Sequence, residues 1–344
     1  MSFYEQNDGW YRPINANEHT YTEGFGFSPH PPYMVERRLI SRCSNALVLT
    51  LVGYMFVLSF LNHFFSSAIY SLLPYDYYPG FSDAIIQISD MLSYMLALTV
   101  PFFIYAICIK IPVSAYLPFK RVSAKLMITA VLASLAVSSV ANYSADAAYI
   151  VFSNIGLPFY EPAAAMPADI AGMVLYVINV SIVAAVFEEI AFRGVVMQSL
   201  RRFGDGFALI CSSVLFAMVH ISPVSIPHAF LMGLIIGYFV LFTGSIHVGM
   251  LIHFIYNLST LIIAQFVVFD YRLGYTVYFA ARAAVTLAGI AALVWLVKNY
   301  QNMFDIKSSS TVNPFNEKIR SFFATVPFLL FCITIVVQAV SYLL

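Results

Sequence analysis

The sequence predicts an all-α protein, a multi-pass bundle of transmembrane helices, and three observations lead to this prediction. Hydrophobic residues make up 61% of the 344 residues, against about 45–50% in soluble domains. Charged residues make up only 10%, the mean hydropathy is +0.83, and apolar runs of membrane-spanning length recur along the chain. This composition excludes a soluble enzyme, a disordered regulator and a nucleic-acid binder that relies on a broad basic patch.

The N-terminal segment, residues 1–44, differs from the rest of the chain. It is rich in Tyr, Pro, Asn and Gly, shows neither helical nor strand periodicity, and starts without a basic, signal-like stretch. We expect a disordered cytoplasmic tail and no cleavable signal peptide. The four cysteines lie in or beside apolar runs without metal-ligand spacing, so we expect them to be packing residues.

Nine apolar runs after this tail are candidates for spanning helices, because a span needs about 20 mostly apolar residues. Three fall in an N-terminal unit (45–150), four in a central unit (170–270) and two in a C-terminal unit (271–344). The fifth and sixth are short, and are either tilted spans or a pair packed inside the bundle. The runs cover residues 46–70, 84–109, 125–148, 170–192, 207–221, 227–243, 247–268, 277–297 and 321–343.

The distribution of Lys and Arg gives an independent test of this count. With the N-terminus in the cytoplasm, 15 of the 17 basic residues fall in alternate, inner segments, and only Arg272 and Arg282 lie on the outer side. Because basic residues concentrate in cytoplasmic loops, this segregation predicts nine spans with the C-terminus outside. The short loops are typical of a bacterial plasma-membrane protein.

Ionisable residues inside the predicted spans are costly and cluster in the central unit. Glu189 and Arg193 are four residues apart on one helix face and can pair, whereas Glu188 points about 100° away. Two further pairs with the same spacing, Phe216 with His220 and His253 with Asn257, follow on later spans. Glu188, His220 and His253 lie roughly 20, 20 and 14 Å from the inner helix ends at 1.5 Å per residue. We therefore expect one shared polar pocket.

Each motif also has a structural interpretation. The Glu188–Arg193 segment can be the polar end of a helix, and an intramembrane histidine such as His220 can be a hydrogen-bond partner between helices. The pair Gly233 and Gly237 suits close helix packing but also arises by chance in apolar segments. A purely structural role is the weaker interpretation, because the carboxylate, the two histidines and the asparagine occur together at matching depth on neighbouring spans.

A carboxylate, two imidazoles and an amide in a water-poor pocket suit the activation of water against a carbonyl. Glu188 can act as general base, His220 can position the water or bind a metal, and His253 with Asn257 can stabilise an oxyanion. No serine or cysteine nucleophile setting, HExxH, GxSG or GxGD motif is present, which excludes the other familiar membrane proteases.

The three motifs, EExxxR at Glu188, FxxxH at Phe216 and HxxxN at His253, resemble those of CPBP intramembrane proteases. That family comprises the CAAX prenyl proteases and the bacteriocin-processing or self-immunity (Abi) proteins. The resemblance covers residues 170–270. It implies Glu188 as the water-activating base, His220 as its partner or metal ligand, and His253 with Asn257 as the oxyanion site, supported by Glu189, Arg193 and Phe216.

The resemblance also implies a hydrolase whose substrate is a membrane-embedded or lipidated peptide. Such proteins are often labelled metalloproteases, and Glu188, His220 and His253 can hold Zn²⁺ or another divalent metal, although the same residues can work without one. The alternative is a non-catalytic membrane protein, a transporter or an immunity-type partner, whose polar cluster binds an ion or a protein.

Overall fold

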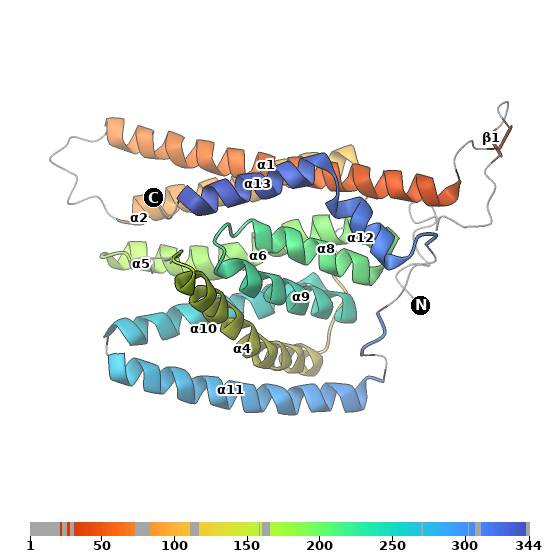
Figure 1. The fold of residues 1–344 in the computed structure, drawn as a ribbon. Helices are drawn as coiled ribbons and strands as arrows, with labels where there is room; N and C mark the ends of the chain where they lie inside the picture. Colours follow the sequence, from red (N-terminus) through yellow and green to blue (C-terminus); the bar gives the residue numbers. More distant parts are fainter. Residues whose placement is uncertain are drawn as a thin grey trace.

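The computed structural model is a bundle of long helices (Figure 1). Two two-residue strands, β1 (Tyr21–Thr22) and β2 (Gly26–Phe27), pair antiparallel within the N-terminal segment. The rest of that segment up to residue 30 lies outside the described residues, so its predicted disorder is not tested. The structure describes residues 21–22, 26–27, 31–72, 83–110, 117–157, 159, 166–269, 271–301, 303–306 and 311–341.

The helices follow the predicted apolar runs closely. In chain order they are α1 (Pro32–Leu72), α2 (Asp83–Cys108), α4 (Ala124–Asn154), a continuous run at 170–203, α8 (Asp205–Met218), α9 (Ser225–Thr243), α10 (Ile246–Phe269), α11 (Tyr271–Asn299), α12 (Phe315–Phe323) and α13 (Val326–Ser341). The continuous run consists of α5 (Ile170–Val177), π-helix η2 (Ile178–Val183), α6 (Ala184–Glu188), π-helix η3 (Glu189–Val196), α7 (Met197–Leu200) and 3₁₀-helix η4 (Arg201–Phe203).

The multi-pass helical bundle is confirmed, but the number of full-length spans is smaller than predicted. Within the described residues, seven helices are long and apolar enough to cross a membrane, or eight if α12 and α13, bent by 64°, form one span. The predicted fifth span is α8, which has only 14 residues. At 1.5 Å per residue it is about 21 Å long, shorter than the hydrocarbon core of about 30 Å.

The chain nevertheless runs back and forth as the charge distribution predicts. The 31-residue helix α4 separates the segment before residue 124 from the segment after residue 154, so these two loops lie at opposite ends of the bundle. Helix α1 begins at the right of Figure 1 and α13 ends at the left, which agrees with an odd number of passes.

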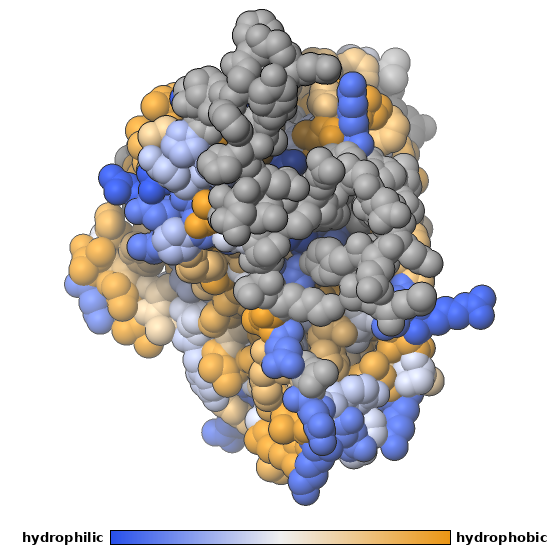
Figure 2. Space-filling model, turned by 90° about the vertical axis from the view of Figure 1, so that its right-hand side faces the viewer, coloured by the Kyte–Doolittle hydropathy of each residue, from blue (hydrophilic) through white to orange (hydrophobic). Residues whose placement is uncertain are grey.

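Most basic residues that the structure describes gather at the end of the bundle where α1 begins. This end carries the start of α1, the end of α11 and helix α12 (Figure 1), and Figure 2 shows blue, hydrophilic side chains gathered on it. The cytoplasmic side assigned to it stays a prediction from the positive-inside rule. Besides Arg272 and Arg282, Arg193 departs from this pattern: it is 1% exposed and lies within a helix, not in an inner loop as predicted.

The predicted boundary at residue 44 is wrong, because α1 begins at Pro32. The first turns of α1 are buried against the C-terminal segment before and within α12. Glu36 accepts hydrogen bonds from the backbone and side-chain nitrogens of Asn313, each at 2.7 Å, and the Ser44 hydroxyl donates to the Phe322 carbonyl at 2.6 Å. These contacts over a long sequence separation leave no local periodicity by which the sequence could reveal them.

Candidate active site

The site begins at the junction of α6 and η3, where Glu188 and Glu189 follow each other on the same broken helix. Glu188 is 9% exposed and Glu189 is fully buried. The π-helical segments η2 and η3 flank α6 on both sides, and π-helical turns occur frequently at functional sites. The two carboxylates have different hydrogen-bond partners on their own sides, Tyr94 for Glu188 and Arg193 for Glu189, and both approach His253.

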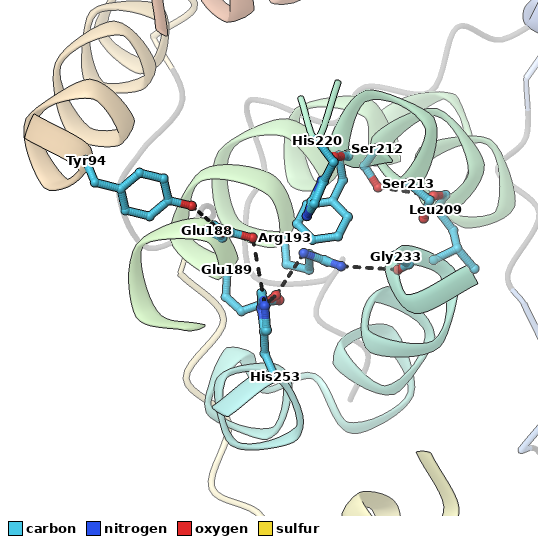
Figure 3. Close-up of polar contacts among 11 residues, drawn as sticks. Tyr94, Glu188, Glu189, Arg193, Leu209, Ser212, Ser213, His220, Gly233 and His253 are labelled. Atoms are coloured by element: carbon cyan, nitrogen blue, oxygen red, sulfur yellow. Dashed lines mark hydrogen bonds and ion pairs between the residues drawn. The ribbon is translucent and has the colours of Figure 1, made fainter. Parts of the chain in front are cut away.

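Glu189 forms the centre of a buried ionic network. Its Oε1 accepts a hydrogen bond from Arg193 Nη1 at 2.8 Å and a second one from His253 Nδ1 at 2.9 Å (Figure 3). The predicted pairing of Glu189 and Arg193 on one helix face is therefore confirmed. The network also links η3 to α10, because His253 comes from α10.

Arg193 is held from three sides. Besides Glu189, its Nη2 donates to the carbonyl oxygen of Gly233 at 3.4 Å, and its guanidinium carbon lies 4.3 Å from the centroid of the Phe216 ring. A cation over an aromatic face is attracted by the ring quadrupole. Phe216 thus supports Arg193, which gives the first residue of the FxxxH motif a physical role.

Glu188 approaches the same histidine, but less closely than Glu189 does. Its Oε2 lies 3.9 Å from His253 Nε2 and has no hydrogen-bond partner among the described residues. Its Oε1 accepts a hydrogen bond from the hydroxyl of Tyr94 on α2 (Figure 3). One oxygen of Glu188 is therefore fixed, and the other is directed toward His253.

His220 follows the end of α8 and borders the same region, with its ring edge-on to Phe216 at a centroid distance of 4.9 Å. Its Nδ1 lies 2.9 Å from the carbonyl oxygen of Phe216. A carbonyl only accepts, so this nitrogen carries the proton, and Nε2 of neutral His220 keeps its lone pair. In Figure 3 the ring of His220 points toward Arg193.

Asn257 lies one turn after His253 on α10 and is turned toward the broken helix. Its Nδ2 donates to the carbonyl of Val180, in η2, at 2.9 Å. An amide carries two N–H groups, so this contact occupies one and leaves the second for another acceptor. The expected shared face of His253 and Asn257 is present in the structure, and both side chains point toward the run 170–203.

The close approach of α10 to Glu189 depends on Gly249. A Cβ atom at this position would lie 2.6 Å from Val240 Cγ2 and 3.0 Å from Glu189 Oε2. Gly233 has a similar role between α9 and α8, where a Cβ would lie 2.9 Å from the Cβ of Ser213. The Gly233 and Gly237 pair therefore serves close packing, and chance is the wrong interpretation of it.

A metal ion does not fit the arrangement of the candidate ligands. Among the described residues, no three His, Cys, Asp or Glu side chains lie close enough to hold one ion. Glu188 and His253 face each other, but His220 has its Nδ1 on a backbone carbonyl, and two ligands fall short of the three that a catalytic zinc site provides. The mechanism below therefore contains no step through a metal.

Tyr94 is the residue of this site that sequence reasoning missed. It lies on α2, far from the three motifs in the sequence, and it is one of 23 tyrosines in the chain. Tyr54 on α1 is a second buried tyrosine of the bundle. A tyrosine in an apolar helix is common, so no local signal distinguishes these two from the others.

The comparison with family models agrees with the motifs. Residues 170–259 match the family model described as "Type II CAAX prenyl endopeptidase Rce1-like". The matched segment contains all the motif residues, and it confirms the predicted resemblance to CAAX-processing endopeptidases. No curated protein and no solved structure matches the chain. Helices α1, α2, α4, α11, α12 and α13, including Tyr94, lie outside the matched segment.

Proposed function

We propose that this protein is an intramembrane endopeptidase that hydrolyses a peptide bond with a water molecule activated by Glu188. The single observation that carries the proposal is that the two carboxylate oxygens of Glu188 differ in their hydrogen bonding. Oε1 is fixed by Tyr94, while Oε2 has no partner among the described residues and lies 3.9 Å from His253 Nε2. A buried carboxylate oxygen without a partner is costly, so this oxygen needs a ligand.

We place the attacking water between these two atoms. The separation of 3.9 Å is too long for a direct hydrogen bond, but a water about 2.8 Å from both atoms would make an angle of about 90° between them. Glu188 would accept one proton of this water as the water oxygen attacks the carbonyl carbon of the substrate. The proton would later pass to the nitrogen of the leaving amine.

The charges of the network suit this reaction. The cluster contains two negative carboxylates, Glu188 and Glu189, and one positive guanidinium, Arg193. One additional proton, shared between Glu188 and His253, makes its net charge zero, which a low-dielectric interior favours. The hydrogen bond from His253 Nδ1 to Glu189 fixes the ring. A proton on the other ring nitrogen, Nε2, is then directed toward Glu188. From there it can stabilise the developing oxyanion together with the second N–H of Asn257.

His220 completes the proposed site from the other side. With Nδ1 bound to the Phe216 carbonyl, its Nε2 can accept a hydrogen bond from water or from the substrate amide. The match at residues 170–259 supports a membrane-associated peptide, lipidated or embedded in the bilayer, as the substrate. Glu188, His253 and Asn257 lie on helices that are long and apolar enough to cross a membrane, which is where such a substrate can reach them.

The test is cleavage of a fluorogenic membrane peptide by the purified, detergent-solubilised protein. One arm uses a prenylated peptide with a C-terminal CAAX sequence, the second the same peptide without the lipid, and the third a transmembrane peptide. Turnover in any arm that is lost in Glu188→Gln supports the proposal. If Glu188→Gln cleaves at the wild-type rate, the mechanism is wrong, and the cluster belongs to an ion-binding or protein-binding membrane protein.

A further inference from the structure

A cavity lies away from the candidate active site, on the other side of α10. Its volume is about 620 Å³, and it is lined by residues of α4, the start of α9, α10 and α11. Tyr256 on α10 lines this cavity, whereas the neighbouring Asn257 faces the broken helix. Helix α10 therefore separates two sites, and nothing in the proposed protease mechanism uses the second one.

One wall of the cavity carries a cation inside the membrane-spanning part of the chain. Arg282 lies 11 residues after the start of α11, roughly 17 Å along the helix. Its guanidinium donates to the Tyr278 hydroxyl and to the Ser139 carbonyl, and its carbon lies 4.1 Å from the Tyr143 ring centroid. These partners orient the guanidinium but do not neutralise its charge.

No carboxylate of the described residues compensates Arg282 directly. None of the ion pairs between described residues includes it, although Asp146 on α4 lines the same cavity. An intramembrane arginine is costly and usually faces a polar partner or a ligand pathway. Among the described residues, Arg282 thus presents a cation at the wall of a cavity that an anion can enter.

The opposite wall offers further hydrogen-bonding groups. The Tyr256 hydroxyl lies 2.8 Å from Asn142 Oδ1 and 2.8 Å from His228 Nε2, and the rings of His228 and Tyr256 are stacked. Apolar side chains complete the lining, namely Leu135, Ile262, Ile263, Val277 and Val285. The cavity thus combines one cation and a polar network with an apolar wall in a volume of about 620 Å³.

We propose that this cavity binds one anionic amphiphile, a carboxylate or phosphate head group on an apolar chain, with the head group on the Arg282 guanidinium. Arg presents paired N–H donors that match both kinds of oxyanion. The chain lies against the apolar wall of α4, α10 and α11, the three helices that run side by side in the lower part of Figure 1. The same chemistry is present in a free fatty acid and in an anionic phospholipid.

Equilibrium binding to the purified Glu188→Gln protein tests the proposal independently of proteolysis. The probes are radiolabelled oleate and phosphatidylglycerol, with oleyl alcohol, phosphatidylcholine and acetate as competitors. We expect saturable binding of one probe molecule per chain. Unlabelled oleate or phosphatidylglycerol should displace the probe at a concentration at least about tenfold lower than oleyl alcohol does. Whichever of oleate and phosphatidylglycerol competes better identifies the preferred head group.

Three variants locate the site. Arg282→Gln should weaken oleate binding by about 10- to 100-fold, and Arg282→Lys should retain part of it. Val285→Trp fills the cavity without removing the cation and should abolish binding. Arg272→Gln, on the same helix outside the lining, is the matched control and should bind as the parent protein does.

Two results would overturn the proposal. Equal binding of oleate and oleyl alcohol would show that the charge is irrelevant, and unchanged binding in both Arg282→Gln and Val285→Trp would place the ligand elsewhere. Oleate binding by the Asp146→Asn variant tests whether Asp146 compensates Arg282. If oleate binds only in this variant, Arg282 is compensated by Asp146 in the native protein, and the cavity holds no anion.

Discussion

His253 and Glu189 are joined by a hydrogen bond of 2.9 Å between Nδ1 and Oε1. This contact determines what the other ring nitrogen can do. Because a carboxylate only accepts, Nδ1 carries the proton, and Nε2 is turned toward Glu188 at 3.9 Å. The supporting glutamate thus orients the histidine, and the histidine in turn faces the proposed base.

The first prediction concerns the base. Glu188→Gln keeps the shape of the side chain and removes its basic oxygen, so peptide cleavage should fall by about 10²–10⁴-fold while the protein still inserts and folds. Turnover of the fluorogenic peptide measures this. His63→Ala, an intramembrane histidine outside the motifs, is the control and should retain the parent rate.

The second prediction concerns Tyr94. Tyr94→Phe removes the only described donor to Glu188 Oε1, so the carboxylate loses its fixed orientation. We expect kcat to fall by about tenfold to a hundredfold with little change in KM, because a hydrogen bond to a charged group contributes about 1.5–3 kcal/mol. Tyr105→Phe is the matched control on the same helix, since its hydroxyl contacts Ser199. Equal effects of both changes would remove Tyr94 from the site.

The third prediction compares the buried ion pair with a half-exposed one. Arg193→Met leaves the fully buried Glu189 without its strongest partner, which should lower the free energy of unfolding by about 3–5 kcal/mol. Arg37→Met breaks the half-exposed pair with Glu317 and should cost clearly less, about 1 kcal/mol. Denaturant unfolding in detergent measures both, and the double variant Glu189→Gln with Arg193→Met should recover part of the loss.

The fourth prediction uses the close approach at Gly249. Gly249→Ala places a methyl group against Val240 Cγ2 and Glu189 Oε2, so α10 must move away from Glu189 and the His253 contact should lengthen. Both activity and thermal stability should decrease, and Val240→Ala should partly restore them. Gly53→Ala is the control, because its Cβ would meet Pro101 at 3.5 Å, an ordinary contact distance. A fully active Gly249→Ala would contradict the proposed geometry.

The fifth prediction concerns metal dependence. Because no three candidate ligands of the described residues converge on one point, we expect the cleavage rate to be unchanged after dialysis against EDTA or 1,10-phenanthroline. Adding Zn²⁺ back should not increase it. A rate that disappears with chelator and returns with Zn²⁺ would show that His220 moves to join Glu188 and His253 as a third ligand.

The sequence by itself determined the bundle, the approximate positions of its helices and the three motifs that meet at the site. Apolar runs predict helices because a membrane interior requires every backbone group to be bonded within the chain, and the four-residue spacing of Glu189 and Arg193 predicts their pairing. These are local properties, and periodicity reports them directly. The start of α1 was missed, because helix ends depend on contacts with distant segments such as that between Glu36 and Asn313.

The tertiary structure alone decided which groups meet across helices. Glu188 is oriented by Tyr94 from α2, and Glu189 binds His253 from α10 because Gly249 lets the two helices approach. The Arg282 cavity likewise needs four helices that are distant in the sequence. The physical reason is that spacing along one helix determines which residues share a face, but only packing between helices determines what that face meets.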